Sequence, residues 1–212
     1  FSFIEHLNDE VENKEYFIHY VALYDTNVEE KLRNDKKFLT LFDVVVLGGS
    51  DSFGNSTNCI TPSFINDLKL FHNKEGILLF LHDVTYMKSK EIVRPLSNLM
   101  GFSDNNVPNE RIEQVELIKN IGKEEVVTKP FFVGEKFTVS NTHRTPVYNS
   151  DFDVVSGQNQ NYYSENLEEH IADIQIGHTI GISIEEQKFF FNVICRLYNF
   201  SRDHHVKTKF QI

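Results

Sequence analysis

The chain has 212 residues, of which 40% are hydrophobic and 25% are charged. This size and composition predict a single globular domain over residues 1–212 with a hydrophobic core of its own. The formal net charge is -10, so phosphate backbones and anionic lipid surfaces are repelled, and neither nucleic acid nor membrane insertion is expected. The chain begins at Phe1 rather than Met, which is consistent with removal of a signal or an upstream domain, and we expect it to be a fragment or module of a larger protein.

The cysteines and the glycosylation acceptors bear on the compartment. Cys59 and Cys195 are too few for a disulfide framework, and they lack the CxxC spacing of a zinc site. Asn55 and Asn199 each begin an Asn-X-Ser/Thr acceptor, which favours a location outside the cell or at its surface. A chain this rich in asparagine also produces such matches by chance, so a cytoplasmic location remains the alternative.

Apolar runs that end in polar or glycine residues recur along the chain. They cover residues 17–25, 42–49, 77–83 and 171–178. Runs that are apolar on both faces are typical of parallel strands covered by helices on each side. We therefore predict a three-layer, flavodoxin-like α/β sandwich, with a mostly parallel central sheet, helices on both faces and a few antiparallel edge strands.

Two stretches carry helix-start signals. Thr61 can cap a helix that continues to about Asn73 with apolar residues at helical spacing. Ser183 and Glu186 form a capping box, which predicts a long amphipathic helix that ends near Tyr198 and packs across the sheet.

The middle of the chain is less regular. Residues 110–118, 126–132 and 136–143 alternate in polarity or contain proline, which predicts short, antiparallel edge strands. The polar stretch 155–170 is predicted to be a long loop.

Polar residues follow the predicted strands at their carboxyl ends, where open α/β sheets bind ligands. The candidate ligand-binding residues at this rim are Asp51, His82, Asp83, His143, Arg144, His178 and Thr179. If the three histidines converge there, they are also the candidates for acid–base catalysis.

Each candidate also has a purely structural interpretation. Asp51 suits a turn or helix cap, His82 suits a buried, hydrogen-bonded histidine, and Asp83 points away from His82 in an extended chain. Three imidazoles can hold zinc, but no HExxH pair is present, so no cofactor is expected and a divalent metal is the less favoured alternative. The turn at residues 48–54, GGSDSFG, is neither a GxSxG elbow nor a phosphate-binding loop.

Three segments, taken in order, resemble the class I glutamine amidotransferase-like fold, and in particular its trehalose-utilisation-like (ThuA-like) branch. They are FDVVVLGGSDSFG, GILLFLHDVTYM and IADIQIGHTIGISIEEQKFFFNVI. The resemblance implies a nucleophile turn after the strand at residues 77–83, and a catalytic histidine at the position of His178, before the closing helix.

The departures from this family bear on activity. Glutamine hydrolysis needs a thiolate at the nucleophile turn, and His82 stands there instead. Ile180 stands where a glutamate would orient the imidazole of His178. Glutaminase activity is therefore not expected. The ThuA-like branch commonly has a histidine at the position of His82, and similar modules occur inside larger surface or extracellular proteins.

These observations favour a non-catalytic, amidotransferase-like module for binding or assembly with other protein chains or domains. The aromatic stretches FVGEKF and NQNYY are its predicted contact surfaces. The alternative is an enzyme or receptor for a small polar, sugar-like ligand in a pocket lined by His82, His143 and His178, with or without a metal.

Overall fold

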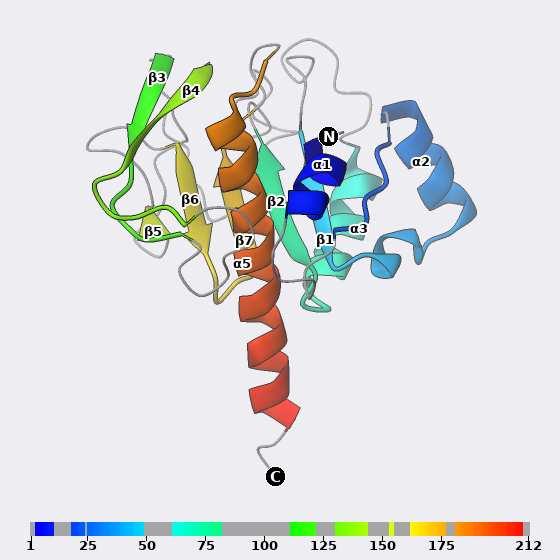
Figure 1. The fold of residues 1–212 in the computed structure, drawn as a ribbon. Helices are drawn as coiled ribbons and strands as arrows, with labels where there is room; N and C mark the ends of the chain where they lie inside the picture. The colour runs from blue at the N-terminus through cyan, green and yellow to red at the C-terminus, as the bar shows by residue number, and fades with distance from the viewer. Residues whose placement is uncertain are drawn as a thin grey trace.

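Figure 1 shows the fold as a computed structural model of the chain. The structure describes residues 3–10, 18–23, 25–48, 61–81, 111–121, 130–143, 153–154, 162–176 and 181–209.

The central sheet has five strands in the order β1-β2-β7-β6-β5 (Figure 1). β1 (Val44–Leu47), β2 (Ile77–Leu81) and β7 (Ile171–Ile174) pair in parallel. β6 (Tyr163–Asn166) runs antiparallel to β7, and β5 (Asp153–Val154) runs antiparallel to β6. All strands except β6 therefore point the same way, and the sheet is mostly parallel.

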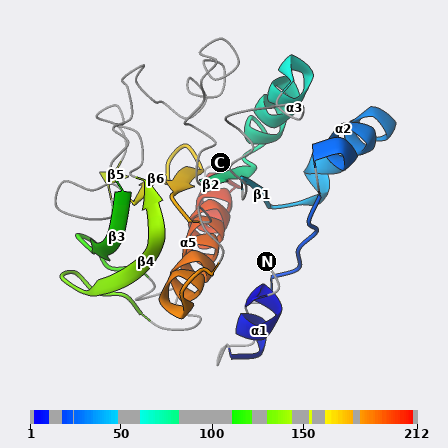
Figure 2. The ribbon, with the colours of Figure 1, turned by 90° about the horizontal axis from the view of Figure 1, so that it is seen from above.

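Helices cover both faces of this sheet, as seen from above in Figure 2. The helices are α1 (Phe3–Glu10), α2 (Asp25–Asn34), η1 (Phe38–Leu41, a 3-10 helix), α3 (Pro62–His72) and α5 (Ile184–Lys209). On one face, α3 packs against Leu78 and Phe80 of β2. On the other face, α1 and α5 pack against Ile77 and Leu79. The predicted three-layer α/β fold class is confirmed.

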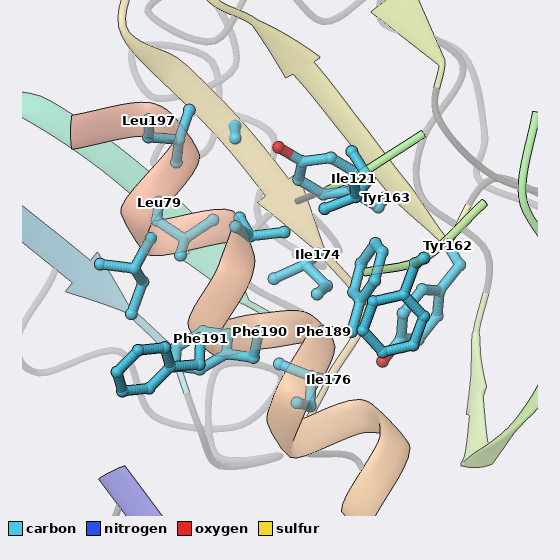
Figure 3. Packing of buried hydrophobic residues seen from close by; sticks show 14 of the residues in the cluster. Leu79, Ile121, Tyr162, Tyr163, Ile174, Ile176, Phe189, Phe190, Phe191 and Leu197 are labelled. Atoms are coloured by element: carbon cyan, nitrogen blue, oxygen red, sulfur yellow. The ribbon is translucent and has the colours of Figure 1, made fainter. Parts of the chain in front are cut away.

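The larger core cluster lies between the sheet and α5 (Figure 3). Phe189 is fully buried, and its ring centroid lies 5.6 Å from that of Tyr163 and 6.2 Å from that of Tyr162. Phe190 joins α5 to α1 through an edge-on contact of 5.9 Å with Phe3. Aromatic burial of this kind dominates core stability, so α5 is the main cover of this face.

A second, two-stranded antiparallel sheet lies beside the first turns of α5. It consists of β3 (Arg111–Glu116) and β4 (Lys136–His143), whose register shifts between Ile112 and Gln114. The Ser183 hydroxyl donates to the backbone carbonyl of Thr138 at 3.0 Å, which joins this sheet to the start of α5.

The sequence predictions for the parallel strands and the helix starts are confirmed. The predicted strands 42–49, 77–83 and 171–178 contain β1, β2 and β7. The antiparallel strands predicted at 110–118 and 136–143 are β3 and β4, but they form a separate sheet, and the antiparallel strands at the edge of the central sheet are β5 and β6. Thr61 caps α3 by accepting a hydrogen bond from the Phe64 N–H at 3.2 Å. The strand predicted at 126–132 lies mostly outside the described residues, although Phe131 forms an isolated antiparallel bridge with Ile121.

The prediction of a strand at residues 17–25 is wrong. Residues 18–23 form no strand, and α2 begins at Asp25. The side-chain amide of Asn8 donates to the Ile18 carbonyl at 3.0 Å and accepts from the Ile18 N–H at 2.9 Å. Because α1 already satisfies these backbone groups and Val21 is 60% exposed, this segment gains little by joining a sheet.

Two further boundaries differ from the prediction. The loop predicted at 155–170 contains β6, which turns into β7 through residues 167–170, with His170 at a φ of 51°. The helix predicted to end near Tyr198 continues to Lys209, since no glycine or proline interrupts it. Within the described ranges, no helix is both long and apolar enough to cross a membrane.

Candidate functional site

The carboxyl ends of three parallel strands lie side by side. Leu47 of β1 pairs with Phe80 of β2, and Leu81 at the end of β2 pairs with Ile174 at the end of β7. In open α/β sheets the loops that leave this edge form the ligand site. The segments that carry Asp51, His82, Asp83, His178 and Thr179 therefore follow neighbouring strands of the sheet.

Most of the predicted site residues lie outside the described residues. They are Asp51, His82, Asp83, Arg144, His178 and Thr179. His143 is described only in its backbone, where it ends β4 opposite Arg111 in the second sheet. Within the described ranges, no group of three His, Cys, Asp or Glu side chains could hold a metal ion. The convergence of the three histidines stays a prediction.

A buried polar cluster lies at the carboxyl edge, next to β2. It consists of Ser164 of β6, Asp173 of β7 and Gln175, and these residues are 0%, 0% and 2% exposed. Gln175 Nε2 donates to Asp173 Oδ1 at 2.7 Å. Asp173 pairs with Phe80 on one side and with Ser164 on the other. We call these three residues the β7 polar cluster.

The β7 polar cluster lies on the sheet face opposite α5. Tyr163 and Ala172 belong to the core cluster under α5, and side chains alternate between the faces of a strand. The residues that follow them, Ser164 and Asp173, therefore point to the face that α3 covers farther along the sheet. Polar groups buried this deeply are costly unless they are hydrogen-bonded, so this cluster is a candidate for a role beyond packing.

A second buried carboxylate, Glu186, fixes the start of α5. The backbone N–H groups of Ser140 and Ser183 each donate to Glu186 Oε2 at 3.0 Å, and the Tyr162 hydroxyl donates to Oε1 at 2.9 Å. The Ser140 hydroxyl lies against Oε2 and against the carbonyl of Gly181. These contacts join the second sheet, the residue before β6 and the first turn of α5. They hold Gly181, the first described residue after the segment that carries His178.

The environment of Tyr162 keeps its hydroxyl protonated. The side chain is fully buried, and burial raises its pKa well above the ordinary 10.0, with the Glu186 charge and the hydrogen bond to Glu186 adding to the effect. Tyr162 is therefore a hydrogen-bond donor to Glu186 throughout the neutral range.

Glu165, the third buried carboxylate, has a structural partner. Arg196 of α5 donates through Nε to Oε2 at 2.9 Å and through Nη2 to Oε1 at 3.0 Å. The Tyr163 hydroxyl donates to the same Oε2 at 2.8 Å. This bidentate pair connects β6 to α5 on the face opposite the β7 polar cluster.

The cysteine that the structure describes lies away from the carboxyl edge. Cys195 is 3% exposed and packs in the core under α5. It follows Ile184, the first residue of α5, by 11 positions, which places it about 16 Å along the helix. Cys59 lies outside the described residues.

The sequence predictions missed Asp173, Gln175 and Glu186 as candidates for a polar site. Asp173 and Gln175 occupy alternate positions of the apolar run IADIQI, so both fall on one face of the strand. The sequence carried a signal for a polar site here, because the charged residue Asp173 lies inside a run that is predicted to be a buried strand. For Glu186 the capping box predicted the bond with Ser183, but not those with Ser140 and Tyr162.

The fold and the carboxyl edge together define an α/β domain of the flavodoxin-like type, with a mostly parallel sheet between helices. The chain is similar in structure to a protein from Bacteroides uniformis ATCC 8492 that is provisionally named ThuA-like. The TM-score is 0.53 and the sequence identity is 14%, over 94% of this chain and 81% of that chain. This likeness supports a ThuA-like fold.

The other comparisons add little. The chain also aligns with a cytoplasmic protein from Salmonella typhimurium, at a TM-score of 0.46 and 14% identity, over 82% of this chain and 75% of that chain. No protein-family model and no curated protein matches the sequence.

Proposed function

We propose that the chain is a non-catalytic, amidotransferase-like module that serves binding or assembly with another protein chain, within a larger protein. The observation that carries the proposal is the position after β2. This strand ends at Leu81, and His82 follows it where the resembling enzymes have a cysteine. The burial of Cys195 along α5 supports the same conclusion, because a thiolate nucleophile must be accessible at the carboxyl edge.

An exposed apolar surface supports an assembly role. Ile118, Phe132 and Val133 are 44%, 49% and 60% exposed, and we call them the apolar turn. They lie on adjoining segments, since the Gly134 N–H donates to the Leu117 carbonyl at 2.8 Å. Exposed aromatic and aliphatic side chains that lie close together are typical of protein contact sites.

The two predicted contact stretches have different outcomes. Phe132 and Val133 of FVGEKF are exposed, whereas Phe137 at its end is 4% exposed and belongs to the core. Tyr162 and Tyr163 of NQNYY are fully buried and bonded to Glu186 and Glu165, so the prediction that they contact a partner is wrong. The proposed contact is therefore limited to the apolar turn.

The assembly role is tested by replacing the apolar turn. We expect the native protein to crosslink to one recurrent protein neighbour in its source material, and the double variant Phe132→Ser, Val133→Ser to lose that neighbour. Leu41→Ser is the matched control, because Leu41 is 71% exposed but lies in η1. A protein that sediments as a monomer and crosslinks to no neighbour would contradict the proposal.

The proposal that the module is non-catalytic is tested separately. Ammonia release from glutamine should stay at the rate of the buffer alone. Placing a cysteine after β2, in His82→Cys, should not restore activity, because Ile180 stands where the family has the glutamate that orients the catalytic histidine. Glutamine turnover by the native protein that survives thorough repurification would overturn this part.

We place this module at the cell surface or outside the cell, which the acceptors at Asn55 and Asn199 suggest. Asn199 lies within α5, and its side-chain oxygen is buried, so it lacks the surface-loop setting in which acceptors are used. Of the two acceptors, only Asn55 therefore supports a location at the cell surface or outside the cell. Mass spectrometry of the native protein for a glycan on Asn55 tests it.

A second function is favoured by the β7 polar cluster. We propose that the carboxyl edge binds a small polar ligand, because three buried polar side chains lie there, on the sheet face where α3 packs against the apolar residues Leu78 and Phe80. Binding of this kind does not depend on the assembly role and can coexist with it.

A further inference from the structure

The β7 polar cluster contains a hydroxyl without a partner. Ser164 Oγ is fully buried, and within the described part of the chain it has no hydrogen-bond partner. Native proteins satisfy nearly all such groups, because a buried hydroxyl that has lost its water costs stability. Each exception calls for an explanation, such as a functional role or a bound water or ion.

The neighbours of Ser164 show where the missing partner would bind. Asp173 lies directly across the antiparallel β6–β7 pair, a spacing at which opposite Cβ atoms are about 5 Å apart. Gln175 holds Asp173 through the 2.7 Å bond to Oδ1. The hydroxyl, the carboxylate and the amide therefore face one region, level with Phe80, the next-to-last residue of β2.

We propose that Ser164, Asp173 and Gln175 form one wall of a ligand site at the carboxyl edge of β2 and β7. The ligand is small, carries several hydrogen-bond donors and has no negative charge. This inference rests on the second proposed function and is independent of the first.

The ligand class follows from the groups that the site presents. A carboxylate only accepts hydrogen bonds, and a serine hydroxyl donates one and accepts others. A ligand with several donors supplies the bond that Ser164 lacks and also fits beside an acceptor such as Asp173. An anion is disfavoured by Asp173 itself and by the net charge of -10. The hydroxyl groups of a polyol and the ammonium group of an amine share the required chemistry.

The test compares the native protein with Ser164→Ala by titration calorimetry, using myo-inositol as the polyol, ethanolamine as the amine and sulfate as the anionic control. We expect one of the first two probes to bind and sulfate not to bind. Ser164→Ala should weaken binding at least about tenfold, as expected for one lost hydrogen bond in a buried site. Ser201→Ala removes a buried hydroxyl from α5, on the other side of the sheet, and should leave binding unchanged.

Thermal unfolding of the free proteins supplies the second readout. Ser164→Ala should melt no lower than the native protein, because the hydroxyl that it removes has no partner in the free state. A clear drop in the melting temperature would mean that a structural water already satisfies Ser164, and would overturn the inference.

The remaining outcomes separate the inference from the function on which it rests. If a probe binds equally well to both proteins, Ser164 does not line its site and the inference fails, while small-ligand binding itself is retained. If neither donor-rich probe binds, both the inference and the second proposed function fail. Asp173→Asn distinguishes the ligand sources, because losing the negative charge should weaken ethanolamine binding more than inositol binding.

Discussion

The Tyr162 hydroxyl donates to Glu186 Oε1 at 2.9 Å, although both side chains are fully buried. Tyr162 directly precedes β6, and Glu186 belongs to the first turn of α5. This bond therefore connects the antiparallel side of the sheet to the helix that covers its core.

Tyr162→Phe should lower the free energy of unfolding by about 1–2 kcal/mol near pH 8, because Glu186 then loses a buried donor. The difference should shrink at alkaline pH. The pKa of Tyr162 is raised in the folded protein, so above pH 10.0 the unfolded chain releases a proton that the folded chain retains, and native stability falls. Urea unfolding from pH 7 to pH 11 measures this. A difference that does not change with pH would contradict it.

Glu186→Ala should destabilise the protein by about 3 kcal/mol, since it leaves the Ser140 and Ser183 N–H groups and the Tyr162 hydroxyl unbonded. Glu185→Ala removes the same charge from the same turn of α5 at an exposed position and should cost less than about 0.5 kcal/mol. The urea concentrations at the unfolding midpoints of the two variants measure this difference in stability. Equal losses would mean that Glu186 acts only through its charge at the helix start.

Arg196→Ala should destabilise the protein by about 3–5 kcal/mol, because Glu165 is 1% exposed and would lose its bidentate partner. Adding Glu165→Gln to Arg196→Ala should recover part of the loss, since the amide carries no charge to bury. Chemical unfolding of the two single variants and the double variant gives the coupling energy. Arg202→Ala, at an exposed position on α5, is the control. Additive losses would contradict a coupled pair.

Gly76→Ala should destabilise the protein by about 1–3 kcal/mol through overpacking. A Cβ at this position overlaps the ring of Phe71, which is 3% exposed in the α3 core. In a Phe71→Leu background the same change should cost less, because the smaller side chain leaves room. Gly134→Ala has open space but a φ of +82°, so its cost should not depend on residue 71. Thermal unfolding of these variants distinguishes overlap from backbone strain.

The parallel part of the fold was predictable because its signals are local. β2 is buried at all five residues, and the run ILLFL shows this in the sequence. The capping residues Thr61 and Ser183 likewise act within one turn of their helices. The predictions that failed involve residues whose hydrogen-bond partners are distant in sequence. The bonds between Ile18 and Asn8 replace the strand predicted at 17–25.

β6 illustrates the same limit. Its sequence YSEN is polar enough to predict a loop, and its burial depends on Arg196, which neutralises Glu165 from 31 positions away. For the candidate site, the sequence predicted the shared carboxyl edge of β1, β2 and β7. It did not predict the cluster of Ser164, Asp173 and Gln175, because the pairing of β6 with β7 brings Ser164 to Asp173.

The pairing of β2 with β7 also determines how the chain can fold. Leu78 pairs with Ile171 across about 90 intervening residues, whereas β1, α3 and β2 are consecutive. Contacts this distant in sequence slow folding, because a large loop must close before they form. We therefore expect β1, α3 and β2 to associate early. The hydrophobic face of β2 under α5 stays open until the last helix has been synthesised, which makes that interval the one most prone to aggregation.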